Sequence, residues 1–158
     1  MTGATPRFIT ADGLARLRAE YDQLFGHERP KLVEVISWAA GNGDRSENGD
    51  YIYGRKRLRE IDRRLSHLAR VMKAAKVVDP AAQATNAVRF GATVELADDD
   101  DARRVVTIVG DDETDAGAGR IGWSSPIARA LIGAKVGDER IVHLPASEKS
   151  YEVISIYY

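Results

Sequence analysis

A short glycine-rich segment gathers acidic side chains that could bind a metal ion. Residues 41–51 contain Asp44, Ser46, Glu47 and Asp50. Magnesium takes oxygen ligands and often uses one or two protein carboxylates, while water and substrate phosphate complete its octahedron. Asp44 and Glu47 are three residues apart, so at the start of a helix they can face the same side. The spacing makes these two carboxylates candidate magnesium ligands.

The same spacing also fits a structural role. Asp44-x-x-Glu47 matches a capping box, in which the first side chain accepts from first-turn amides and the second reaches back. The helix dipole favours acids at this end in any case. On spacing alone, capping is the favoured interpretation. The two roles are separable, because a lost cap costs about 1 kcal/mol of stability, whereas a lost metal ligand removes activity from a folded protein.

A strongly basic stretch follows this segment. Residues 55–76 contain nine Lys and Arg residues and two acids, for a charge of +7 in a chain whose net charge is −1. A helix face that is merely solvated usually mixes signs, which this stretch barely does. Arginine predominates over lysine, and its planar fork suits bidentate phosphate recognition. We predict contact with a nucleic-acid backbone.

Two helical patterns would position both features. Thr10 can cap a first helix, whose apolar spacing runs from Leu14 to Leu24 and resumes from Leu32 to Ala39; Pro30 between them predicts a kink or local break. The second pattern is a heptad seam of Tyr51, Gly54, Leu58, Ile61, Leu65, Leu68, Met72 and Ala75. Asp79-Pro80 should end it. We predict an antiparallel two-helix coiled coil over residues 1–80, with its acidic tip at residues 41–50.

The period changes after a linker at residues 81–86. Runs rich in β-formers occupy residues 88–96, 103–109, 139–144 and 151–157. Ser125-Pro126 opens a short helical stretch, since proline is tolerated in a first turn. Residues 98–101 are predicted to form a solvated hairpin loop rather than a calcium loop. Residues 81–158 are therefore expected to form a compact α+β domain, which makes the whole chain α+β.

Several classes of protein are disfavoured. The chain has no cysteine, which excludes disulfides. It shows no secretory signal pattern and no run of 18 apolar residues, so we expect a cytoplasmic protein with no membrane partner. The acidic segment lacks a pocket, which argues against a stand-alone nuclease. Only scattered aromatic residues follow residue 87, which argues against a prolyl isomerase.

Long stretches of the chain resemble one known family. WAAGNGDRSENGDYIYGRKRLREIDRRLSHLARVMKAAKVVD closely resembles the coiled-coil domain of the Gre family of bacterial transcript-cleavage factors, in its GreB branch. SSPIARALIGAKVGDERIVHLPA and SYEVISIYY resemble the C-terminal domain of that family, which has an FKBP-like fold. The resemblance covers nearly the whole chain. The combination of GDxSEN with the basic run after it is specific to the family.

The resemblance implies a function carried out inside another protein. Gre factors insert their coiled coil through the secondary channel of bacterial RNA polymerase when the nascent RNA has backtracked. Asp44 and Glu47 would help hold a second magnesium ion beside the polymerase's own, and Ser46 would position water or RNA. The factor would stimulate the polymerase's cleavage activity rather than act as an enzyme, and alone it would bind no metal tightly. We expect a monomer.

The resemblance also implies two contact surfaces. The extruded RNA 3′ segment would be contacted by Arg55, Lys56, Arg57, Arg59 and Arg63. The polymerase would be docked by Ser124, Ser125 and Pro126. The family usually has an acid at the position of Ser124, which is uncharged here. The alternative function is a non-cleaving regulator that occupies the channel, although a pure blocker has no need of Asp44 and Glu47.

Overall fold

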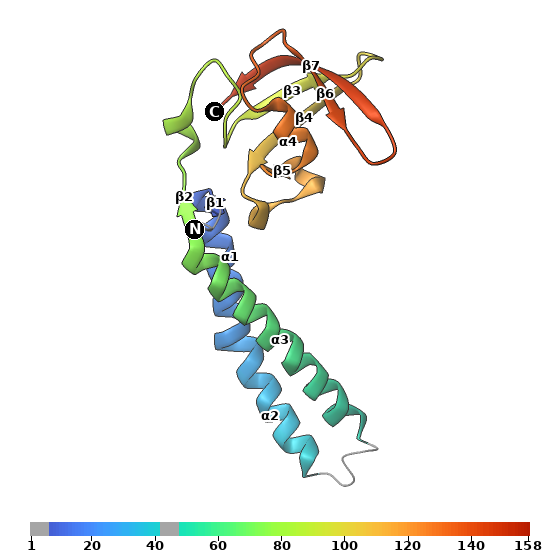
Figure 1. Ribbon diagram of the computed structural model, residues 1–158. Coiled ribbons are helices and arrows are strands. Elements are labelled where there is room, and N and C mark those ends of the chain that lie inside the picture. The colour runs from blue at the N-terminus through green and yellow to red at the C-terminus, as the bar shows by residue number, and fades with distance from the viewer. Residues whose placement is uncertain (1–6, 42–47) are drawn as a thin grey trace, which may run out of the picture. The chain divides into compact units, whose positions relative to one another are not determined.

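The computed structural model describes residues 7–41 and 48–158 (Figure 1). By their contacts these residues form two compact units. The helical unit spans Ala15–Ala74, and the second unit combines the described residues up to Leu14 with Ala75–Tyr158. The boundary predicted at residue 80 stays a prediction. None of the helices in the described residues combines the length and apolar content needed to cross a bilayer.

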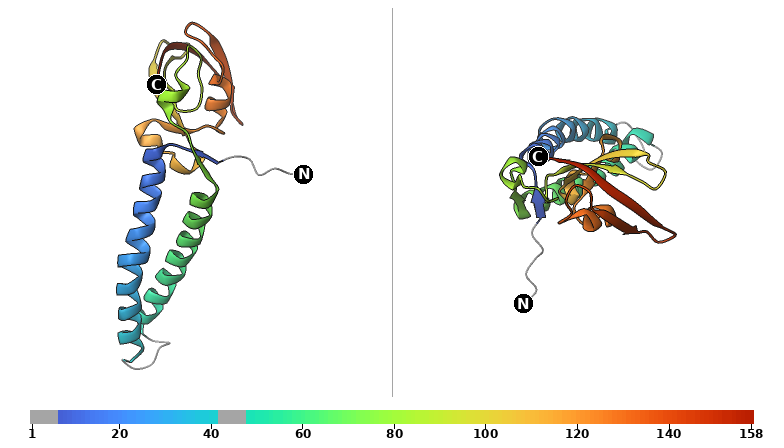
Figure 2. Two further views of the ribbon diagram at one scale, coloured as in Figure 1. Left: turned by 90° about the vertical axis from the view of Figure 1, so that its left-hand side faces the viewer. Right: turned by 90° about the horizontal axis from the view of Figure 1, so that it is seen from above.

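The helical unit is a hairpin, as the coiled-coil prediction requires. Its elements are α1 (Ala11–Gln23), the π-helical segment η1 (Leu24–Glu28), α2 (Arg29–Ala40) and α3 (Gly49–Ala74). The chain runs from α1 into α2, and α3 lies alongside them in Figures 1 and 2. Contacts between Arg64 and Glu20 and between Arg57 and Glu28 show that the two arms are antiparallel.

The expected break before Pro30 is a π-helical turn. The Arg29 N–H donates to the Leu24 carbonyl, five residues back, while Gln23, Glu28 and Arg29 all keep right-handed helical angles. Proline has no N–H, and in a regular helix its ring meets the carbonyl four residues before it. The wider turn just before Pro30 accommodates the proline while the helix continues.

The seam of α3 follows the predicted spacing over most of its length. Gly54, Ile61, Leu65, Leu68 and Val71 are its buried residues. The glycine lets the arms approach, because a Cβ on residue 54 would lie 2.6 Å from Ile36 Cγ1.

The prediction is wrong at the C-terminal end of this helix. Val71 is buried where Met72 was expected, and Met72 is half-buried. The helix ends at Ala74, well before Asp79-Pro80, because residues Ala75–Val77 form strand β2 and pair in parallel with β1 (Arg7–Ile9). The partner strand lies almost seventy residues earlier in the sequence, where a helical periodicity gives no sign of it.

The described residues of the second unit form a five-stranded curled sheet with the strand order β5-β4-β3-β7-β6. Its strands are β3 (Thr93–Ala97), β4 (Arg103–Val109), β5 (Arg120–Gly122), β6 (Glu139–His143) and β7 (Glu148–Tyr157). The short helix α4 (Pro126–Leu131) and the 3₁₀ segments η2 (Pro80–Gln83), η3 (Asp111–Glu113) and η4 (Ala116–Ala118) complete the unit. The α+β class is confirmed.

The core of this unit lies between the sheet and α4. Ala128 and Leu131 of α4 are fully buried against sheet residues such as Val94, Ile108 and Val153. Strand β4 matches its predicted range, whereas β3 begins five residues later than predicted. Strand β5 was not predicted, because three residues beside a loop carry too little period to detect.

The hairpin loop between β3 and β4 is confirmed. Asp98 Oδ1 accepts from the N–H groups of Asp100 and Ala102, at 2.9 Å each. Asp101 adopts a φ of 61°, the left-handed conformation that aspartate tolerates better than most residues. Asp98 therefore organises the turn itself.

Candidate functional site

The predicted metal ligands Asp44 and Glu47 lie outside the described residues, as does the neighbouring Ser46. What the structure describes is where the two helices on either side end and begin. Helix α2 ends at Ala40, and α3 begins at Gly49. Any role of the three residues in binding metal or substrate is therefore a proposal.

Asn48 joins the two ends of the hairpin. Its Oδ1 accepts from the Tyr51 N–H at 3.1 Å, the contact of an N-cap residue, and its Nδ2 donates to the Ala39 carbonyl at 2.6 Å. One side chain thus caps α3 and binds the last turn of α2. The capping box predicted from Asp44 and Glu47 lies outside the described residues and stays a prediction.

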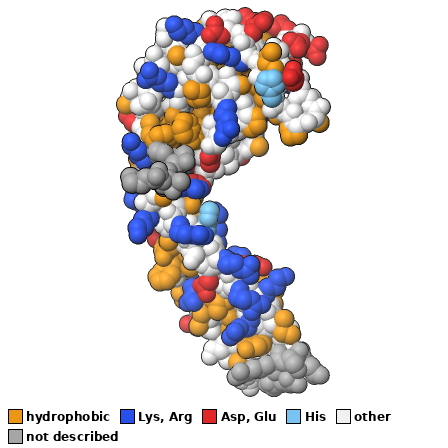
Figure 3. Space-filling model, in the orientation of Figure 1, with side chains coloured by type: hydrophobic (Ala, Val, Ile, Leu, Met, Phe, Trp, Pro, Cys, Tyr) orange, Lys and Arg blue, Asp and Glu red, His pale blue; other side chains and the backbone are white. Residues whose placement is uncertain are grey.

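Four of the five predicted RNA-binding residues share one outer face of α3. Arg55, Lys56, Arg59 and Arg63 are all exposed. At 3.6 residues per turn they fall within an arc of about 100° on the side opposite the buried seam. We call these four residues the basic stripe. Figure 3 shows Lys and Arg side chains gathered over the helical unit.

The fifth residue, Arg57, points elsewhere. It is half-buried beside the seam and bonds Glu28 of the other arm at 2.8 Å and Glu60 at 3.4 Å. The hydrogen bond to Glu28 raises the pKa of its guanidinium, with the negative charges of both carboxylates adding to the effect against partial desolvation. Arg57 therefore clamps the two arms, and its charge is compensated within the chain.

Further ion pairs cross the hairpin beside the seam. Arg64 bonds both oxygens of Glu20, and Arg29 bonds Asp62 at 2.8 Å. The hydrogen bond from Arg64 is the main cause that lowers the pKa of Glu20. Acids beside the seam thus pair with arginines, and no ion pair among the described residues involves a residue of the basic stripe.

Exposed aromatic residues lie near the C-terminal end of α2 and the N-terminal end of α3. Trp38 and Tyr53 are 65% and 67% exposed, whereas Tyr51 is half-buried. Tyr51 belongs to the predicted seam and Tyr53 does not, and their exposures differ accordingly. An aromatic ring beside a basic stripe suits single-stranded nucleic acid, whose bases stack and whose phosphates pair.

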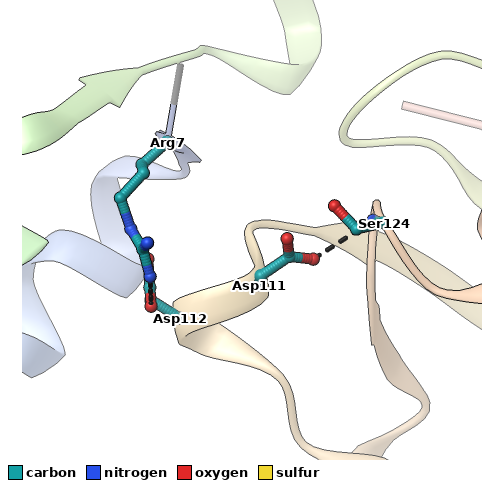
Figure 4. A network of polar contacts seen from close by, with 4 residues as sticks. All are labelled: Arg7, Asp111, Asp112 and Ser124. Atoms are coloured by element: carbon teal, nitrogen blue, oxygen red, sulfur yellow. Dashed lines mark hydrogen bonds and ion pairs between the residues drawn. The ribbon is translucent and has the colours of Figure 1, made fainter. Parts of the chain in front are cut away.

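The predicted docking residues lie at the start of α4, and each has a different role. Ser125 is the N-cap, since its Oγ accepts from the Ala128 N–H at 3.3 Å, and Pro126 occupies the first turn. Ser124 is exposed, and its N–H donates to Asp111 Oδ1 at 3.1 Å (Figure 4). Ser125 is therefore structural, while Ser124 and Pro126 are accessible.

Two surface hollows in the described part of the chain meet at Ser124 and Arg129. The first, of about 310 Å³, is lined by Arg7, Phe8, Asp111, Asp112, Trp123, Ser124 and Arg129. The second, of about 360 Å³, is lined by Ser124, Pro126, Arg129, Ala130, Ile141 and His143. Ser124, which both hollows share, belongs to the segment expected to dock the polymerase.

The walls of the first hollow are rigidly held. Arg7 donates to both oxygens of Asp112, and this hydrogen bond raises the pKa of the guanidinium (Figure 4). Phe8 and Trp123 meet edge to face, with ring centroids 4.9 Å apart. Strand β1 thus forms one side of the hollow, because its residues reach η3 and the turn before α4.

A buried carboxylate fastens the start of α1 next to this hollow. Glu113, 7% exposed, accepts from the N–H groups of Thr10 and Gly110 and from the Thr10 hydroxyl. Thr10 also caps α1, as predicted, because its Oγ1 accepts from the Gly13 N–H. A Cβ on residue 13 would lie 2.3 Å from Glu113 Oε1, so glycine is required there.

Comparison with known proteins assigns both parts of the chain. The protein-family model described as "Transcription elongation factor, N-terminal" matches residues 7–77. The family model described as "Transcription elongation factor, GreA/GreB, C-term" matches residues 83–158. The chain belongs to the GreA/GreB family of transcription elongation factors. The recognised resemblance is confirmed.

Individual members of the family align over almost all of the chain. Transcription elongation factor GreB of Neisseria meningitidis serogroup B is 48% identical over 159 residues, covering 100% of this chain and 98% of that protein. GreB of Xanthomonas axonopodis pv. citri is 48% identical over 151 residues, covering 95% and 90%. GreA of Acidiphilium cryptum is 40% identical over 151 residues, covering 95% and 96%.

Solved structures also align with this chain. The transcription factor Gfh1 aligns at 19% identity and a TM-score of 0.47, covering 99% of this chain and 100% of that one. The factor "GreA/GreB from Nitrosomonas europaea" aligns at 21% identity and a TM-score of 0.42, covering 96% and 98%. The family assignment rests on the sequence matches.

Sequence reasoning missed four side chains of this GreA/GreB factor, namely Arg7, Asp111, Asp112 and Arg129. The acids of residues 111–113 had a visible signal, a run of three between a strand and a turn. Their separate roles could not be read from it, because one is exposed, one pairs with Arg7 and one is buried. Only the folded arrangement separates them.

Proposed function

We propose that this GreA/GreB factor enters the secondary channel of bacterial RNA polymerase and stimulates the polymerase's own cleavage of backtracked RNA. The basic stripe of α3 carries the proposal. Its four cations are exposed and form no ion pair among the described residues, while the neighbouring Arg57 and Arg64 are neutralised by acids of the other arm. Uncompensated positive charge on an exposed helix attracts a polyanion, here the extruded RNA 3′ segment.

Asp44 and Glu47 are the proposed ligands of a magnesium ion shared with the polymerase. Two carboxylates separated by three residues match the oxygen ligands that magnesium prefers. Asn48 supplies an N-cap contact of α3, and this contact requires neither carboxylate. When bound, such an ion would stabilise the attacking and leaving oxygens of the phosphodiester. The factor completes a site that belongs to the polymerase and is not itself the nuclease.

The test uses halted, backtracked elongation complexes. The wild-type chain should release short 3′ RNA fragments when magnesium is present, whereas Asp44→Asn and Glu47→Gln should bind polymerase without releasing them. Asp50→Asn is the matched control, because Asp50 is an acid of the same region in the first turn of α3. It should retain cleavage.

Other outcomes point to other functions. If the wild-type chain binds polymerase and no fragment is released, it is a non-cleaving regulator of the channel. If it cleaves RNA in the absence of polymerase, it is an enzyme. Cleavage that persists in both Asp44→Asn and Glu47→Gln would remove these carboxylates from the mechanism.

A further inference from the structure

Asp111 presents a carboxylate beside Ser124 that forms no ion pair with a cation of the described residues, and the attraction of Arg7 reaches it only at longer range. Asp111 is exposed at the start of η3, and one of its oxygens accepts from the Ser124 N–H (Figure 4). Asp112, by contrast, has a side chain only 12% exposed and is bonded to Arg7. Within residues 7–41 and 48–158, Asp111 has no ion pair within 4.0 Å.

The turn before α4 holds this carboxylate in place. A Cβ on residue 122 would lie 2.5 Å from Asp111 Oδ1, so Gly122 leaves the space that the carboxylate occupies. The turn itself is fixed by backbone bonds of 2.9 Å, from the Trp123 N–H to Val109 and from the Ser125 N–H to Gly122. An acceptor fixed before binding loses little entropy when a partner arrives.

The hollow next to Asp111 suits a long basic side chain. Phe8 and Trp123 supply aromatic surface, which packs well against the methylene stem of lysine or arginine, while the charged head reaches a carboxylate. Arg7 adds little repulsion, because Asp112 neutralises it. Arg129 also lines the hollow and is the competing cation.

We propose that Asp111 is a docking residue, which receives a lysine or arginine side chain of the polymerase in the hollow beside Ser124. The assignment rests on the proposed function, since the partner is the polymerase. Ser124 is uncharged, so the acidic group of the Ser124–Pro126 surface comes from Asp111, thirteen residues earlier in the chain. Asp111 lies beside Ser124 because the fold places η3 against the turn before α4. The acidic group is therefore distant in sequence from the serine.

The test measures binding of the full-length chain to RNA polymerase at several salt concentrations. Asp111→Asn keeps an oxygen that accepts from Ser124 and removes only the charge. We expect affinity to fall about tenfold, close to the lower limit measured for close interfacial charge pairs, and to depend less on salt. Asp99→Asn is the control, because Asp99 is an exposed acid in the β3–β4 loop of the same unit.

A second variant distinguishes docking from structural damage. Ser124→Asp placed in the Asp111→Asn chain returns a carboxylate to the mouth of the same hollow, so it should restore affinity. Unrestored affinity would mean that Asp111 acts through the local structure, and the assignment would fall.

Two further results separate this assignment from the function on which it rests. Equal affinity of Asp111→Asn and wild type would overturn the assignment alone. The same holds if Arg129→Gln loses binding while Asp111→Asn keeps it, because the hollow would then receive an acid. A wild-type chain that does not bind polymerase would overturn the proposed function as well.

Discussion

Arg57 and Arg59 are two residues apart on α3, and we predict that replacing them affects different properties of the protein. Arg57→Gln removes a guanidinium that bonds Glu28 at 2.8 Å and Glu60 at 3.4 Å. Arg59→Gln removes an exposed cation of the basic stripe. The first change should lower stability, and the second should lower RNA-dependent cleavage.

The size of the stability effect follows from exposure. The side chains of Arg57 and Glu28 are 35% and 37% exposed, so solvent screens much of their attraction. Pairs of this kind contribute roughly 0.2–1 kcal/mol each. For a chain of this length, a loss of about 1 kcal/mol lowers the melting temperature by about 2–4 °C. Arg59→Gln should leave stability unchanged within about 0.5 kcal/mol.

The functional effect is a change in salt dependence. One phosphate contact to a single strand contributes about 0.7 to the slope of log affinity against log salt. Arg59→Gln should therefore reduce cleavage of long backtracked RNA most at low salt and flatten the salt profile. Thermal unfolding followed by helical circular dichroism and cleavage of backtracked complexes, measured on the same preparations, compare the two variants.

One outcome would contradict the different roles of Arg57 and Arg59. If Arg57→Gln impairs cleavage more than Arg59→Gln at a temperature where both variants are folded, Arg57 contacts RNA despite its intramolecular pairs. The division of α3 into a clamping edge and a basic stripe would then be wrong.

Two further predictions concern the stability of the hairpin. Asn48→Ala should lower the unfolding free energy by about 1 kcal/mol through the lost cap on Tyr51, and Asn48→Asp, which keeps that acceptor but loses the donor to Ala39, should recover part of it in the same thermal assay; no loss in either variant would contradict the capping role. Arg64 lowers the pKa of Glu20, so the stabilisation from this pair is present above the ordinary pKa of 4.5 and is lost as pH falls through the lowered folded-state pKa. The difference in unfolding free energy between wild type and Glu20→Gln should therefore shrink in acid, and a difference that stays constant from pH 7 to pH 2 would refute the linkage.

Much of the helical unit could be predicted because its signals are local. A heptad seam from Gly54 to Leu68 determines which side of α3 is buried, since side chains three and four residues apart share a face. Thr10 caps α1 as its type and place indicate. The π-helical turn before Pro30 was foreseen only as a break, because the sequence shows that a regular helix is impossible there but does not show which irregular form is adopted.

The errors share a cause that is not local. The end of α3 was placed too late because β2 pairs with β1, which lies near the N-terminus and almost seventy residues earlier in the chain. The capping box of Asp44 and Glu47 stays a prediction, whereas Asn48, which was not predicted as a cap, contacts both Tyr51 and Ala39. Strand and cap choices of this kind depend on partners that are distant in sequence.

By itself, the sequence determined the family, the α+β class and the presence of a basic helix after an acidic segment. The family follows from the resemblance of long sequence stretches, whereas composition and short-range periodicity are enough for the class and the basic helix. The tertiary structure alone decided which charges are available: Arg57 is paired with Glu28, whereas the basic stripe is exposed, and Asp111 lies against Ser124, whereas Asp112 is bonded to Arg7. Charge is a property of a residue, but its compensation depends on which distant side chains the fold brings within hydrogen-bonding distance.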